Sequence, residues 1–214
     1  FPGLNISVIA ACGAMGLKPV IISSVGASTY GANIPLLTWP DMESHLYESG
    51  LIESRSKAVS FGGQNDQGLE FDDVTASEIK SRIESLGYEF IYLDSLDENI
   101  ASRTAIYGEI KAFINVGGNI LSFGENSSMD LSKGGILDSL PSNEKGSGLI
   151  QYYLSQGVPV NHLLNMKDLL PSYGLPYDPI PTPAAGEEDI YFEYKLSSPA
   201  VIASLAGIAF AGII

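Results

Sequence analysis

Residues 18–25 read Lys18-Pro19-Val20-Ile21-Ile22-Ser23-Ser24-Val25, an almost continuous apolar and β-branched run. Such a run is typical of a parallel strand that is covered on both faces. An apolar segment precedes it, bounded by Pro2 at its start and Gly16 at its end, and this pattern predicts a buried helix. The sequence therefore begins with a helix that leads directly into a strand, the repeating unit of parallel α/β proteins.

The same alternation continues along the chain. Apolar runs predict strands at 56–61, 89–93, 112–116 and 158–164, with a further short extended piece at 120–123. Helical spacing predicts helices at 41–49, 75–86, 97–111 and 148–156, with Thr75 as the cap of the second. Residues 124–147 are polar and rich in glycine, which indicates a long surface loop. We expect a doubly wound, Rossmann-like, mainly parallel sheet of about five strands.

The last quarter of the sequence changes character. The α/β domain is expected to cover residues 1–170, followed by a proline-rich and acidic linker over 171–198 with an edge strand at 190–196. Residues 199–214 carry no charge, and Ala203, Gly207 and Ala211 recur every four residues. This small-residue spacing is found where transmembrane helices pack closely, so a membrane helix is expected, with a buried terminal helix as the alternative.

Composition limits the partners. The 214 residues carry a formal net charge of −14, and the Lys and Arg residues, Arg103 among them, are scattered singly, which predicts solvated positions for them. A chain without a basic cluster does not neutralise phosphates, so nucleic acid is not expected as a partner. A single cysteine, Cys12, excludes an internal disulfide and a cysteine zinc cluster, and its apolar surroundings predict a buried thiol.

A ligand site is expected at the carboxyl ends of the strands, where helix N-termini and exposed amides converge in open parallel sheets. The loops that follow the predicted strands are rich in Gly, Ser and Asn. Their small side chains allow backbone N–H groups to approach a ligand, although no P-loop or dinucleotide fingerprint is present. The candidate ligand-binding residues are Ser24, Gly26, Asn33, Gly62, Gly63, Asn65, Asn115, Gly117, Gly118 and Asn165.

Catalysis at this edge would depend on His162, which could act as a general base toward Ser28 or Ser24 and be oriented by Asp66 or Asp94. The catalytic candidates are thus Ser28, His162 and Asp66. No G-x-S-x-G elbow supports them, and a structural histidine with satisfied hydrogen bonds is the competing interpretation. Asp66, Asp94 and His162 are an alternative set of ligands for a divalent metal, but the two-residue ligand spacing of metal sites is missing, so no metal site is predicted. The sequence does not identify a cofactor.

Several of these loops together resemble the bacterial poly-gamma-glutamate system protein family. The similar segments cover roughly residues 1–183 and include 21–28, Gly31-Ala32-Asn33, Thr38-Trp39, 41–43, 60–63, Arg103 with Ile106-Tyr107, 114–118, 158–165 and 173–176. The resemblance implies an accessory protein of poly-γ-glutamate biosynthesis or export in the cell envelope. It brings no established catalytic residues. Members of this family carry an additional N-terminal part, so the resemblance also implies that one strand is lacking before residue 1.

Taken with residues 199–214, the resemblance gives three open hypotheses. The first is a membrane-associated accessory component that binds a small ligand or chain end, works beside other membrane components and holds its α/β domain outside the cytoplasm. The second is a Ser/His-dependent amide hydrolase or transferase, and the third is a non-catalytic scaffold. A protein of charge −14 repels a polyanion at long range. A short or neutral chain end therefore fits the site better than the whole polymer.

Overall fold

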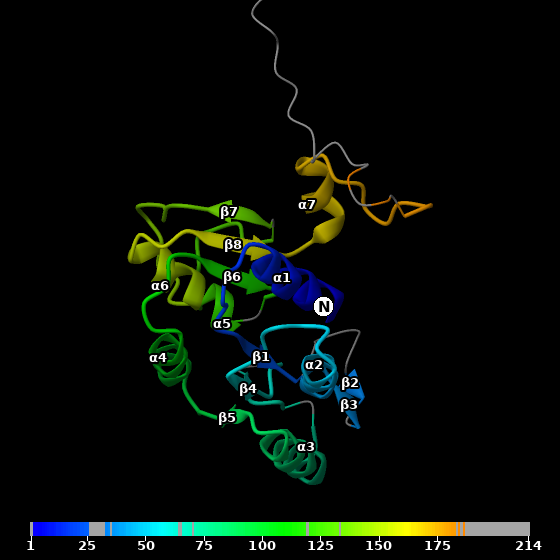
Figure 1. Ribbon diagram of the computed structural model, residues 1–214. Coiled ribbons are helices and arrows are strands. Elements are labelled where there is room, and N and C mark those ends of the chain that lie inside the picture. The colour runs from blue at the N-terminus through cyan, green and yellow to red at the C-terminus, as the bar shows by residue number, and fades with distance from the viewer. Residues whose placement is uncertain are drawn as a thin grey trace, which may run out of the picture. The chain divides into compact units, whose positions relative to one another are not determined.

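The computed structural model describes residues 2–25, 33–34, 36–63, 66–69, 71–118, 120–132, 134–182, 184 and 186. Within these ranges the chain is a mixed α/β protein with two three-stranded sheets and a short hairpin (Figure 1). The chain divides into two compact units, Phe1–Asn165 and Met166–Ile214. Both sheets belong to the first unit, and the described part of the second contains α7 (Met166–Ser172).

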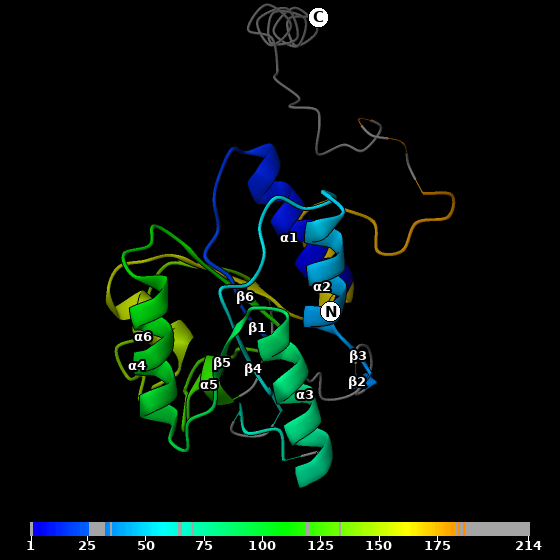
Figure 2. The ribbon, with the colours of Figure 1, turned by 60° about the horizontal axis from the view of Figure 1, so that its bottom comes forward.

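The first sheet is parallel and has the order β1-β4-β5, formed by β1 (Ile22–Ser24), β4 (Ala58–Ser60) and β5 (Glu89–Ile91). Helices α2 (Trp39–Glu48) and α3 (Asp73–Ser85) connect these strands and lie on one side of β1 and β4 in Figure 2. The hairpin of β2 (Asn33–Ile34) and β3 (Leu37–Thr38) precedes α2. Val59, Ile79 and Ile83 are fully buried between sheet and helix, which explains the apolar runs that predicted these elements.

The second sheet has the order β6-β8-β7. β6 (Phe113–Val116) and β8 (Val160–Leu163) are parallel, and β7 (Gly135–Leu137) runs antiparallel to β8. Its core is shared with α4 (Leu96–Tyr107), α5 (Ile120–Phe123) and α6 (Leu149–Ser155). Figure 2 places α4 and α6 on the opposite side from α2 and α3. The strands predicted at 112–116 and 158–164 are therefore confirmed.

Four details differ from the sequence-based expectation. Among the described residues the strands form two sheets of three rather than one sheet of about five. The expected loop at 124–147 contributes β7, whose three residues are too short to give a periodic signal. Residues 120–123 form α5 rather than a strand, because a four-residue apolar run does not distinguish the two and the chain turns at Gly117 with a φ of 78°. The cap of α3 is Asp72, whose carboxylate accepts from the amides of Val74 and Thr75.

Helix α1 (Pro2–Ala14) forms as expected, but it is not the buried helix that was predicted, because only Ile9 and Cys12 among its residues are buried. In the described ranges no helix is long and apolar enough to cross a membrane. The predicted edge strand at 190–196 and the predicted membrane helix at 199–214 lie outside the described residues. The domain boundary expected at residue 170 falls inside α7.

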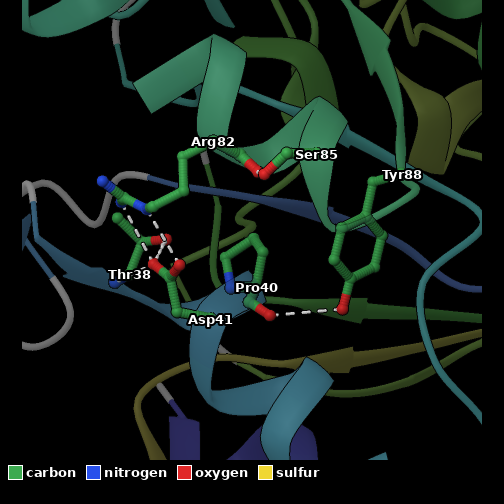
Figure 3. Close-up of polar contacts among 6 residues, drawn as sticks. All are labelled: Thr38, Pro40, Asp41, Arg82, Ser85 and Tyr88. Atoms are coloured by element: carbon green, nitrogen blue, oxygen red, sulfur yellow. Dashed lines mark hydrogen bonds and ion pairs between the residues drawn. The ribbon is translucent and has the colours of Figure 1, made fainter. Parts of the chain in front are cut away.

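The start of α2 is tied to α3 by an ion pair with two hydrogen bonds (Figure 3). Arg82 Nε and Nη2 donate to the two carboxylate oxygens of Asp41 at 2.9 and 3.1 Å. The Thr38 amide and hydroxyl donate to the same carboxylate at 2.7 and 2.6 Å. Burial alone would raise the pKa of Asp41, but the bonds from Arg82 and Thr38 outweigh it and hold that pKa below its usual value. These contacts fix the direction in which the chain leaves the hairpin.

Candidate functional site

A cleft of about 920 Å³ lies in the first unit between the open edges of β1 and β6. Residues 17–25 and 109–118 form its walls, and one side of α1 lines it as well. Three charged residues of its lining, Lys18, Glu109 and Lys111, lie before the amino ends of β1 and β6. A second polar group of the lining lies at the carboxyl ends of the strands, the edge at which the sequence predicted a ligand site. The polar residues there are Ser24, Ser60, Gly63, Asp66, Arg103, Asn115, Gly117, Gly118 and Ser122.

A buried ion pair forms one part of this polar end. Arg103 Nη2 donates to Asp66 Oδ2 at 2.6 Å, and the two side chains are 3% and 4% exposed. Ser60 Oγ donates to Asp66 Oδ1 at 2.8 Å and accepts from Arg103 Nη2 at 2.9 Å. Arg103 Nη1 donates to Asn99 Oδ1 at 2.8 Å. The four side chains hold one another in fixed positions between β4 and α4.

The turn after β4 explains how Asp66 reaches this position. Gly62, Gly63 and Asp66 have positive φ angles of 75°, 70° and 64°. Two glycines adopt this backbone without steric cost, and Asp tolerates it better than most residues. The tight turn brings the Asp66 carboxylate back to the end of β4. Burial raises the pKa of Asp66, and the Arg103 guanidinium counteracts this rise only in part.

A second buried polar group lies at the end of β6 and centres on His162, which is 0% exposed. Asn115 Nδ2 lies 3.0 Å from His162 Nδ1, and His162 Nε2 lies 3.0 Å from the Leu131 carbonyl. An amide nitrogen only donates, so Nδ1 is the acceptor and Nε2 carries the proton given to Leu131. Burial lowers the pKa of His162, which keeps the ring neutral.

Asn115 connects this histidine to the cleft. Its Nδ2 also donates to the Gly117 carbonyl at 2.6 Å, and its Oδ1 accepts from Ser122 Oγ at 2.8 Å. Gly118 follows directly, and a Cβ there would collide with the Phe123 ring. The loop between β6 and α5 therefore needs glycine and is held in place by Asn115.

A third buried polar group centres on the carboxylate of Glu43, which lines the cleft from α2. It is 0% exposed, and both its oxygens accept from Ser56, one from the amide at 3.0 Å and one from the hydroxyl at 2.9 Å. Ser56 Oγ lies 2.8 Å from Ser23 Oγ on β1. Burial raises the pKa of Glu43, and the bonds from Ser56 offset only part of that effect.

The structure brings together five of the predicted ligand-binding residues: Ser24, Gly63, Asn115, Gly117 and Gly118 line the cleft. Gly62 lies in the turn beside it, and Asn165 follows β8 with a φ of 51°. Gly26, Ser28 and Asn65 lie outside the described residues, and for Asn33 only the backbone is described.

The predicted catalytic residues have separate partners. Asp66 is bonded to Arg103 and Ser60, whereas His162 is bonded to Asn115 and Leu131. Both ring nitrogens of His162 are thus engaged, and its pKa is lowered, which disfavours a role as general base. The alternative interpretation, a histidine with satisfied hydrogen bonds, describes this geometry.

Sequence reasoning missed Arg103, Ser60 and Ser122. Arg103 was expected on a solvated face, and this expectation is wrong because the side chain is 3% exposed. The helix 97–111 contained a signal, since Asn99 and Arg103 lie one turn apart beside the apolar Ile100. An asparagine and an arginine on the buried side of a helix indicate a polar partner on the neighbouring strand.

In the described part of the chain, no group of three or more His, Cys, Asp or Glu side chains is close enough to hold a metal ion. No protein-family model, curated protein or solved structure matches the chain.

Proposed function

We propose that this chain is a membrane-associated accessory component of a poly-γ-glutamate biosynthesis or export system, and that the polar end of its cleft binds a short γ-glutamyl chain end. The sequence resemblance suggests the system. The observation that supports a binding site is the convergence of Ser60, Asp66 and Arg103 with Asn115 and Ser122 at one end of a cleft of about 920 Å³. A cleft of this size holds a ligand of a few residues.

The charge of the cleft fits such a ligand better than the net charge of the chain does. The charged residues in its lining are three of each sign: Lys18, Arg103 and Lys111 against Glu43, Asp66 and Glu109. The cleft is formally neutral although the chain carries −14. Burial also raises the pKa of Glu43 and of Asp66, which disfavours their charged forms. A chain end with one amino group and a few carboxylates therefore meets less repulsion here than on the rest of the surface.

We also propose that the fold is a doubly wound α/β arrangement, and the position of the cleft agrees with the ligand site of such folds. In such folds ligands bind beyond the carboxyl ends of the strands, at the point where successive strands start to be added in the opposite direction. β4 and β5 extend the first sheet away from β1, whereas the chain after α4 continues at β6. The cleft between β1 and β6 lies at this change of direction.

Binding is favoured over the amide hydrolase alternative because His162 is fully buried and bonded through both nitrogens. The scaffold alternative predicts no ligand at all. Membrane association depends on residues 199–214, and cell fractionation tests it. We expect the protein with residues 199–214 intact to be in the membrane fraction after a high-salt wash, and its recovery in the soluble fraction would contradict this part of the proposal.

Calorimetric titration tests the binding proposal. We expect γ-linked oligomers of two to four glutamates to bind saturably, with an affinity that changes little between low and moderate salt. Ser122→Ala is expected to weaken binding roughly fivefold, because Asn115 loses a hydrogen-bond donor and the lining is less well fixed.

Ser155→Ala is the matched control, since Ser155 is exposed on α6 and its hydroxyl bonds Tyr152 of that helix and the neighbouring Gln156. It should bind as the wild type does. A chain-end site in the cleft would be contradicted if the long polymer alone gave a heat of binding, if that binding weakened steeply with salt, and if Ser122→Ala did not change it.

A further inference from the structure

Ser23 on β1 lines the cleft one residue before Ser24 of its polar end. It is half-buried, so part of its side chain is open to the cleft. Its Oγ lies 2.8 Å from Ser56 Oγ, and Ser56 Oγ lies 2.9 Å from Glu43 Oε1. Two hydroxyls thus form a chain of hydrogen bonds that leads from the cleft to a carboxylate that is 0% exposed.

The hydrogens of this chain have one possible arrangement when Glu43 is ionised. A carboxylate accepts hydrogen bonds and donates none, so Ser56 gives its single hydroxyl hydrogen to Glu43. Ser56 Oγ then has only lone pairs left, and Ser23 gives its own hydrogen to Ser56. The part of Ser23 Oγ that remains for the cleft is an acceptor. Glu43 therefore determines, through Ser56, that a ligand at Ser23 has to be a donor.

The charge of Glu43 indicates what kind of donor this is. In the described part of the chain no Lys or Arg forms an ion pair with Glu43. Arg55 attracts the carboxylate from a greater distance, but its guanidinium donates to the Leu86 carbonyl and stacks on the Tyr88 ring. A buried carboxylate without a cationic partner is costly, and such groups are concentrated at functional sites. A cationic donor in the cleft supplies the missing countercharge.

A γ-linked glutamate chain carries one such donor. Its first residue keeps a free α-amino group, whereas the amino groups of all later residues are consumed in the γ-amide links. The ammonium group has three N–H donors and a positive charge, and an internal amide has one N–H and no charge. The amino end of the chain is therefore the part that matches an acceptor linked to a buried carboxylate.

We propose that Ser23 Oγ accepts a hydrogen bond from the free α-ammonium group of a γ-glutamyl chain, so that the cleft binds the amino end of the chain rather than its carboxyl end. This assignment rests on the proposed function and names the end of the polymer that the site recognises. Ser23 contacts the ligand. Ser56 and Glu43 are positioning residues, because they fix the direction of the Ser23 hydroxyl.

Calorimetric titration at pH 7 with two γ-linked glutamate trimers tests the proposal. One trimer has a free amino end and the other is N-acetylated, which removes the charge of that end. The free trimer is expected to bind on the order of tenfold more tightly, because it alone makes a charge-assisted hydrogen bond to Ser23. Equal binding of the two trimers overturns the assignment of the amino end and leaves the ligand site itself standing. Absence of binding by either trimer would instead contradict the proposed function.

Two variants test whether the hydroxyl chain causes this preference. Ser23→Ala removes the acceptor, and Glu43→Gln removes the charge and introduces an amide that can donate to Ser56. In both variants the preference for the free trimer is expected to fall to about twofold, whereas a general loss of structure would weaken both trimers equally. Glu48→Gln, at an exposed position of the same helix, is the control and should keep the full preference.

A preference that persists in Ser23→Ala and Glu43→Gln would overturn the proposal. It would then be due to the repulsion between a chain of charge −14 and the more negative acetylated trimer.

Trp39 reports the position of the bound end independently. It is the only tryptophan of the chain, it lines the cleft, and it lies one helical turn before Glu43 on α2. A ligand end at Ser23 is expected to change the tryptophan fluorescence saturably, with the same midpoint as the heat of binding. Binding heat of the free trimer without any change in Trp39 fluorescence would place the ligand away from Ser23 and contradict the proposal.

Discussion

Replacing Arg103 with methionine is expected to lower the free energy of unfolding by about 3–5 kcal/mol, the largest effect of any single substitution considered for this chain. The change leaves the Asp66 carboxylate buried at 4% exposure without its partner 2.6 Å away. Ser60 and Asn99 lose a hydrogen-bond partner as well. Denaturation in urea at pH 7 measures the loss.

Two further variants test whether the unpaired charge of Asp66 causes this loss of stability. Asp66→Asn added to Arg103→Met removes the unpaired charge, and asparagine tolerates the φ of 64°, so most of the lost stability should return. Lys80→Met removes an exposed ion pair whose side chains are 45% and 50% exposed, and it should change stability by less than about 0.5 kcal/mol. An equal loss in the single and double variants would show that the charge of Asp66 is not the cause.

The loss in the free energy of unfolding that Arg103→Met causes also depends on pH. Burial already raises the pKa of Asp66 above its usual value near 3.8, and without Arg103 it rises further. The folded variant therefore binds a proton more readily than the unfolded chain, so its stability increases as the pH falls from 7 toward about 4. The difference in the free energy of unfolding between Arg103→Met and the wild type should therefore become smaller over that range.

Replacing His162 with leucine is expected to cost about 2–4 kcal/mol at pH 7. Leucine fills a similar volume, but the Asn115 amide and the Leu131 carbonyl lose their partner in a site that is 0% exposed. His45→Leu, on the exposed side of α2, should change stability by less than about 0.5 kcal/mol. Thermal unfolding of the two variants against the wild type measures the difference.

The same variant isolates a pH effect. The folded state lowers the pKa of His162 from its usual 6.5, so below that pH the unfolded chain binds a proton that the folded chain does not. The contribution of His162 to the free energy of unfolding is thus fully present above pH 6.5 and is lost as the pH falls below it. The deficit of His162→Leu should shrink from pH 7 to pH 5. A deficit that grows over this range would mean that His162 is charged in the folded protein.

Much of the fold could be predicted because its elements carry strong local signals. Ile21 and Ile22 are partly buried, and Ile79 and Ile83 are fully buried, in the segments expected for a strand and a helix. The division into two sheets could not be predicted, because strand periodicity says which face is buried and nothing about which edge is paired. Helix α5 was missed since four apolar residues fit either structure.

Of the candidate site, the glycines that shape its backbone could be predicted from the sequence, whereas its charged residues could not. Gly63, Gly117 and Gly118 are visible as breaks after strands, and they line the cleft as expected. The charged part depends on contacts across 37 residues between Asp66 and Arg103, which no local pattern records. His162 drew attention for its chemistry, yet its partners Asn115 and Leu131 make it structural.

The most direct test of the proposed ligand site is an amide chemical-shift titration of the isotopically labelled protein with a γ-linked glutamate trimer. The proposal predicts saturable shifts at Ser60, Gly63, Gly117 and Gly118, the residues that line the polar end of the cleft. An absence of saturable shifts at these four amides, or shifts confined to α3 and α6 on the surface, would contradict it.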